Sequence, residues 1–127
     1  MKRDIETRDD LVVLVANFYD LLLSDEIMAP IFIEVAEIDL ETHLPHLVEF
    51  WYSLIFMTGT YRRNVMELHL ALHLKVKLEQ NHFEIWLKYF ENSVRNLYEG
   101  PNSELAIERA NSIAQLMQHK IKQLRID

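Results

Sequence analysis

The segment NHFEIWLKYFENSVRNLYEGP, residues 81–101, decides the fold class of this chain. Its large apolar side chains recur at steps of three and four residues, namely at Phe83, Trp86, Leu87, Phe90, Val94 and Leu97. This spacing places them on one face of an amphipathic helix over residues 81–99. Gly100 and Pro101 predict its end, because glycine favours the turn after a helix and proline cannot continue one.

The same periodicity predicts one helix before this segment in the chain and another after it. In residues 9–24 the apolar positions are Leu11, Leu14, Val15, Phe18 and Leu22. Thr7 and Asp10 resemble a capping box at the start of that helix. The last helix continues to about residue 124, with Asn102 or Ser103 as its cap. Its expected inward face consists of Leu105, Ala106, Ala110, Ile113, Leu116, Met117 and Ile121.

The middle of the chain is less regular. A helix is predicted over residues 40–57, with Asp39 as its cap and Gly59 as its stop. Its apolar face would consist of Leu44, Leu47, Trp51, Leu54 and Ile55. Pro45 lies inside this span, where a proline should kink or delay the helix. Short helices are expected at residues 30–35 and 62–73, and a loop at residues 75–80.

Composition narrows the class of protein further. The 127 residues suit a single domain over 1–127, and with only two glycines and half the residues hydrophobic we expect it to be all-α. Periodicity alone leaves a four-helix bundle and a globin arrangement equally open. The absence of cysteine excludes disulfides and thiolate chemistry. The net charge of −7 argues against nucleic acid as a partner. We expect no signal peptide and no membrane span, and hence a cytoplasmic protein.

Histidines are the residues that most readily suggest chemistry. Four of the six lie between His43 and His73, and neutral imidazole is a good ligand for haem iron. A single histidine on a helix is more often a surface residue, and the H-E-x-x-H pattern of zinc proteases is absent. Tyr19 and Trp86 occupy apolar helical positions, yet each carries a donor that needs a partner when buried.

Four stretches together resemble the group III truncated haemoglobins. They are FY at 18–19 with MAPIF at 28–32, HLPHL at 43–47 with FW at 50–51, TGTY at 58–61 followed by Met66 and His69, and HFEIWLKYF at 82–90. Residues 106–114 of the last helix are similar to that family as well. The resemblance covers nearly the whole chain, and it accounts for Pro45, since the family has a proline there.

The resemblance implies a truncated globin fold, a two-over-two helical sandwich around a non-covalent haem b. It gives His69 as the proximal iron ligand, with His73 one turn further as the rival. Tyr19, His43 and Trp86 would form the distal pocket. The expected haem contacts are Phe32, Leu47, Tyr61, Met66, Leu72, His73 and Phe83.

One part of the pattern differs from the family. The glycine and proline that often precede the proximal histidine are here Arg63 and Val65. Arg62, Arg63 and Lys75 are the available cations for the haem propionates.

The implied function is reversible binding of dioxygen or another diatomic ligand at the haem iron. Tyr19 and Trp86 could donate hydrogen bonds to the ligand, which would slow its release. Slow release favours a redox alternative, in which the protein consumes nitric oxide or peroxide with a reductase as partner. Whether the protein is an enzyme is left open. A ligand sensor and a haem-free helical interaction module are the remaining readings.

Overall fold

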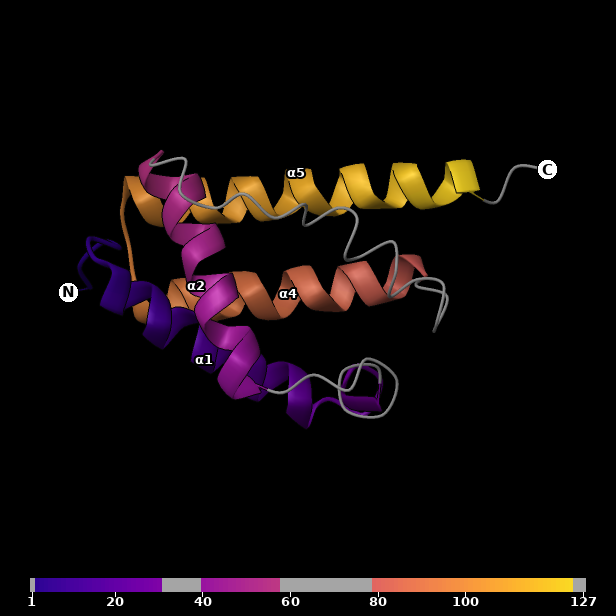
Figure 1. Cartoon of the computed structure of the whole chain (residues 1–127), viewed down its shortest axis with the longest axis horizontal. Helices are drawn as coiled ribbons and strands as arrows, with labels where there is room; N and C mark the ends of the chain where they lie inside the picture. The colour runs from indigo at the N-terminus through magenta and orange to yellow at the C-terminus, as the bar shows by residue number, and fades with distance from the viewer. Residues whose placement is uncertain (1, 31–39, 58–78, 125–127) are drawn as a thin grey trace.

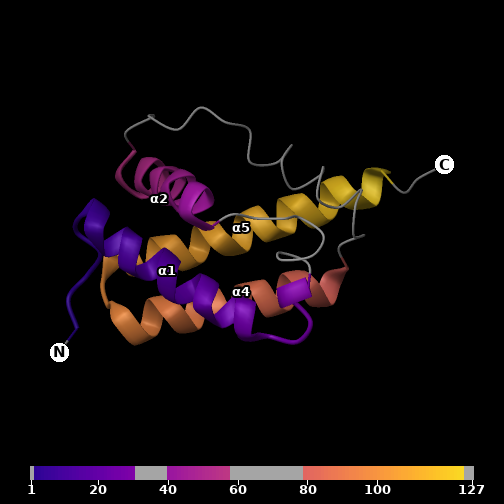
Figure 2. The same ribbon diagram turned by 60° about the horizontal axis from the view of Figure 1, so that its bottom comes forward.

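The computed structural model describes residues 2–30, 40–57 and 79–124, and these contain four helices. They are α1 (Arg8–Ser24), α2 (Leu40–Phe56), α4 (Gln80–Leu97) and α5 (Pro101–Leu124). Helices α4 and α5 run antiparallel side by side, and α2 crosses over them (Figure 1). Helix α1 packs against both α2 and α4 (Figure 2). The all-α prediction is thus confirmed, and the bounds of these four helices lie within two or three residues of those expected.

The start of α1 follows the predicted capping box. The Asp10 amide donates to the Thr7 hydroxyl at 3.2 Å, and the Asp10 carboxylate accepts from the Thr7 amide at 3.0 Å. The same carboxylate accepts from the Glu6 amide at 2.8 Å and from the Arg3 guanidinium. Arg3 is the main reason why the pKa of Asp10 lies well below its ordinary value, although burial acts the other way. This network gives α1 a fixed first turn.

Helix α2 runs through Pro45 without interruption and ends earlier than expected. Its last residue is Phe56, and Met57 takes a left-handed conformation with φ of 55°. Gly59, the expected stop, and Asp39, the expected cap, lie outside the described residues. Proline is tolerated at this position because it is the sixth residue of the helix, so only one intrahelical bond is lost beyond the first turn.

The cap of α5 comes from the other end of the chain. The Asp4 carboxylate accepts from the amides of Asn102 and Ser103, each at 2.8 Å, and from the Ser103 hydroxyl at 2.7 Å. The prediction that Asn102 or Ser103 caps this helix was therefore wrong: Pro101 is already helical, and a proline suits the first helical position. A cap supplied from 98 residues away leaves no local sequence pattern.

The core collects the predicted apolar faces of the four helices. All five of the positions named for α1 are buried, and Phe83, Phe90 and Val94 of α4 pack against them. Leu116 is a correction, because half of its surface is exposed, while Ile107 and Ala114 are buried instead. The face of α5 is therefore rotated slightly from the one predicted. Ile121 and most of the short helices expected in the middle of the chain lie outside the described side chains.

A further hydrogen bond ties the end of α1 to α4. The Tyr89 hydroxyl donates to the Asp25 carboxylate at 2.6 Å, and Asp25 also accepts from the amides of Ile27 and Met28.

Among the described helices, none has the length and the apolar character needed to cross a bilayer.

Candidate functional site

A small cavity of about 40 Å³ lies where the four helices meet. Helix α1 contributes three residues to its wall, α2 three, α4 one and α5 two. They are Val15, Phe18, Tyr19, Leu47, Phe50, Trp51, Trp86, Ile113 and Met117. No charged side chain is among them, so the cavity is an apolar space with a few hydrogen-bond donors at its edge.

Tyr19 is the donor that α1 supplies. It follows Phe18 on the buried face of the helix, and only 5% of its surface is exposed. Burial raises the pKa of the Tyr19 phenol above its ordinary value, because the charged phenolate would lose its hydration. The hydroxyl is therefore protonated throughout the physiological range and can act as a donor.

Trp86 is the contribution of α4, and neighbouring aromatic rings hold its indole. It stacks on Phe90 with ring centroids 5.8 Å apart, and the Phe18 ring meets it edge-on at 5.6 Å. Phe90 in turn stacks against Trp51 of α2 at 4.7 Å. Such contacts add about 0.5–1.5 kcal/mol each to the packing, so the indole has a defined position beside the cavity.

Three predicted site residues thus meet at the cavity: Tyr19, Leu47 and Trp86. Phe83, an expected haem contact, is buried near the start of α4 but does not line this cavity. His43 belongs to α2, one helical turn before Leu47, and its side chain lies outside the described part of the structure. The other predicted residues also lie outside it, namely Phe32, Tyr61, Met66, His69, Leu72 and His73. Within the described part, no three His, Asp or Glu side chains are grouped as a metal site would require.

Sequence reasoning treated six wall residues as ordinary core. They are Val15, Phe18, Phe50, Trp51, Ile113 and Met117. Each lies at an apolar helical position, and nothing in a hydrophobic pattern separates a side chain packed against its neighbours from one that borders a void.

Comparisons with known proteins agree with this fold. No family model matches the chain. A crystal structure of a group III truncated haemoglobin from Campylobacter jejuni superposes with a TM-score of 0.82, at 27% identity, over 95% of each chain. The group 3 truncated haemoglobin Ctb of Campylobacter jejuni is 27% identical over 124 residues, 95% of either protein.

The fold is therefore that of a truncated globin. Over 95% of its length the chain is similar to group III truncated haemoglobins, at 27% identity. This similarity implies a haem cofactor and haem-based binding of a diatomic ligand.

Proposed function

We propose that the protein binds dioxygen or a related diatomic ligand reversibly, on a non-covalent haem b whose iron is held by His69. When bound, haem supplies an iron with one coordination position open to such a ligand. The observation that carries the proposal is the meeting of Tyr19, Leu47 and Trp86 at one cavity. These residues come from three different helices, and the family resemblance assigns all three to the haem pocket.

The residues present fit a haem as one wall of its pocket. A cofactor of this size needs a pocket of about 300–1,000 Å³, so the cavity of about 40 Å³ is too small to be the haem site itself. Its apolar lining and its buried neutral phenol suit the ligand side of a porphyrin. The proposal assigns the remaining wall to the predicted contacts outside the described residues, Phe32, Tyr61, Met66, Leu72 and His73.

Tyr19 has a definite chemical role in this proposal. Its protonated hydroxyl would donate a hydrogen bond to a diatomic ligand in the cavity, and this bond would be stronger if the acceptor carried negative charge. A net hydrogen bond contributes about 0.5–1.5 kcal/mol, and about 1.5–3 kcal/mol when the acceptor is charged. Tyr19 alone should therefore slow ligand release by about twofold to a hundredfold, since 1.4 kcal/mol is a factor of ten. Trp86 is the second donor, and His43 is assigned to the third position.

The proposal is tested with haemin, the oxidised cofactor, and a matched pair of histidine variants. We expect wild-type protein to bind haemin stoichiometrically and to show a strong Soret band. His69→Ala should lose or shift this band, whereas His73→Ala should leave it unchanged. The reverse pattern would transfer the proximal role to His73, and the absence of any band in the wild type would overturn the haem assignment.

The buried phenol also favours one alternative function, the consumption of nitric oxide or peroxide. A donor that retains the ligand makes the protein a poor carrier, but it gives a reductant from a partner reductase time to act. Turnover with a reductant should then exceed that of free haem and fall in Tyr19→Phe. Turnover equal to that of free haem would leave ligand binding as the function.

A further inference from the structure

Arg8, the first residue of α1, joins that helix to one face of α2. Its guanidinium donates to both carboxylate oxygens of Glu49, from Nη1 to Oε2 and from Nη2 to Oε1 at 3.4 Å. The same guanidinium lies over the Tyr52 ring, 4.4 Å from the ring centroid. Glu49 and Tyr52 are three residues apart and therefore share a face of α2. A single cation of α1 thus contacts α2 at two points.

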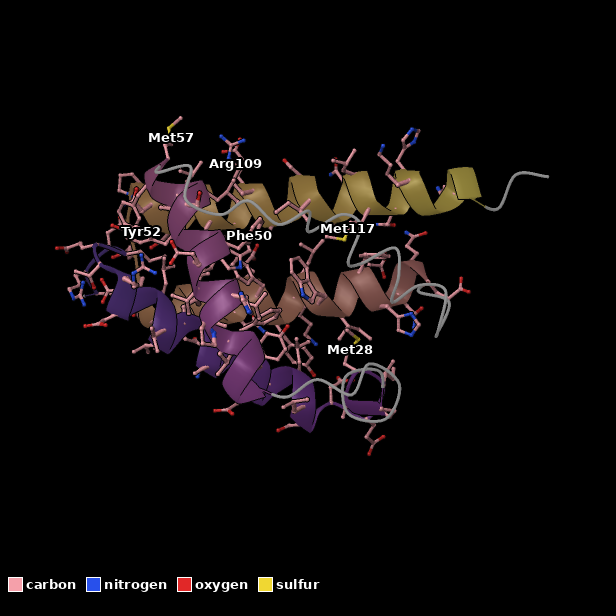
Figure 3. All side chains as sticks on the ribbon, viewed as in Figure 1. Met28, Phe50, Tyr52, Met57, Arg109 and Met117 are labelled. Carbon is pink, nitrogen blue, oxygen red and sulfur yellow. The ribbon has the colours of Figure 1, made fainter. Side chains whose placement is uncertain are left out.

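The face of α2 that this cation holds lies opposite the face that borders the cavity. Phe50 and Trp51 line the cavity. With about 3.6 residues per helical turn, their mean direction lies about half a turn around the axis from that of Glu49 and Tyr52. Figure 3 shows Tyr52 and Phe50 on opposite sides of α2. A rotation of α2 that released the outer face would therefore also move the cavity face.

The contacts of Arg8 have the directional character that such a rotation would oppose. The hydrophobic effect is non-directional, so burial of Val48 and Ile55 does not by itself select one rotation of α2. A guanidinium is a rigid planar fork that pairs with a carboxylate through two donors and stacks on aromatic rings. Arg8 also has an anchored backbone, because it lies between Thr7 and Asp10 of the capping box.

We propose that Arg8 is a positioning residue, which fixes the rotation of α2 through its contacts with Glu49 and Tyr52 and so places the cavity face of α2 beside Tyr19. These two contacts are called the Arg8 clamp below. The inference rests on the proposed function for the ligand that the site would hold, but the clamp itself is a property of the chain. Because 49% of the Arg8 side chain is exposed, salt would screen its ion pair. Ionic strength would thereby regulate the site.

The first test of the clamp measures the position of α2 directly and needs no diatomic ligand. The chain has two tryptophans, so a nitrogen-15 NMR spectrum shows two indole N–H signals, and that of Trp51 reports the cavity face of α2. In the same haem state, Arg8→Met should shift or split this signal. High salt should move the wild-type signal in the same direction and leave that of Arg8→Met in place.

Arg95→Met is the matched control for this spectrum. Arg95 forms an exposed ion pair with Glu104 at 2.8 Å, which joins α4 to α5 and does not involve α2. Its loss should leave the Trp51 signal unchanged. A Trp51 signal of Arg8→Met that coincides with that of the wild type would overturn the clamp, and it would leave the proposed function standing.

The second test measures oxygen release from the haem-loaded protein. Arg8→Met should speed release by about twofold to tenfold, within the range that an exposed ion pair and an exposed cation–π contact supply together. Arg8→Lys keeps the charge but not the planar fork, so its rate should lie between the two. Arg95→Met should release oxygen at the wild-type rate.

The outcomes of the two tests separate the clamp from the proposed function. An unchanged release rate in Arg8→Met, with a normal Soret band, would overturn the positioning role of Arg8 and leave haem binding standing. A Trp51 signal that shifts in Arg8→Met, in a chain that takes up no haemin, would overturn the proposed function and support the clamp.

Discussion

Asp4 should contribute more to stability than its position near the start of the chain suggests. Its Oδ1 accepts from the Ile5 amide and from the amide and hydroxyl of Ser103, while its Oδ2 accepts from the Asn102 amide. A helix cap contributes about 1 kcal/mol, and a negative charge at a helix N-terminus adds about 0.3–1 kcal/mol. Asp4→Ala should therefore lower the free energy of unfolding by about 2 kcal/mol.

The assay is urea unfolding of the wild type, Asp4→Ala and Asp4→Asn in the same haem state. Asparagine keeps the Oδ1 acceptor but turns an amide group toward the Asn102 amide, so about half of the loss should remain. The control is Asp20→Asn, which removes an exposed carboxylate from α1. Its free energy of unfolding should stay within about 0.5 kcal/mol of the wild-type value. A transition midpoint of Asp4→Ala equal to that of the wild type would refute the assignment of Asp4 as the cap of α5.

The contribution of Asp4 to stability should depend on pH, in a direction set by the sign of its pKa shift. Hydrogen bonds from Asn102 and Ser103 hold the pKa of Asp4 below its ordinary value, although burial, the largest single effect, opposes them. A carboxyl with a lowered folded-state pKa stabilises the protein fully above its unfolded pKa of about 3.9. The stabilisation is lost as the pH falls through the folded value. The difference between wild type and Asp4→Ala should thus be constant near neutrality and shrink in acid below about pH 4.

Three further substitutions test individual features of the backbone and core. Ser93→Ala should raise the free energy of unfolding in urea by about 1 kcal/mol, because the Ser93 hydroxyl is fully buried and has no hydrogen-bond partner among the described residues. A decrease of similar size would mean that the hydroxyl does have a partner. Met57→Gly should raise the free energy of unfolding by a similar amount, about 1 kcal/mol, since Met57 has a φ of 55° that glycine adopts without strain, and a lower stability would contradict this. Gly100→Ala should lower the thermal midpoint, because a Cβ there would lie 2.5 Å from Cγ of Asp4 in a backbone with φ of 148°; an unchanged midpoint would mean that the contact yields freely.

Local patterns predicted the helices because the physics that forms them is local. Phe83, Phe90 and Val94 recur with the helical period, and Thr7 with Asp10 marks the start of α1 within four residues. The cap of α5 depends instead on a carboxylate 98 residues away in sequence, which no local pattern records. Met57 ends α2 in a conformation that usually calls for glycine, so a stop was predicted at Gly59.

The candidate site likewise contains some residues that the sequence could predict and others that it could not. Tyr19 and Trp86 were predicted from the family resemblance together with the need of a buried donor for a partner, and the fold brings both to one cavity. Ile113 and Met117 could be assigned to a core face by their spacing. That they border a void depends on how α2 and α5 pack, and packing gaps arise from the shapes of several side chains at once.

The cavity where the four helices meet makes a prediction about stability that is opposite in sign to that of a filled core. A void of about 40 Å³ costs about 1 kcal/mol at the ~24 cal/mol per Å³ found for residual cavities. Met117→Phe would fill it and should raise the free energy of unfolding by up to about 1 kcal/mol. If the side chains around Met117 are instead tightly packed, the larger ring must displace them and should cost about 1–3 kcal/mol. Urea unfolding separates the two cases by sign. A more stable variant would mean that the chain retains an energetically costly cavity beside Tyr19, as expected of a site that trades stability for function.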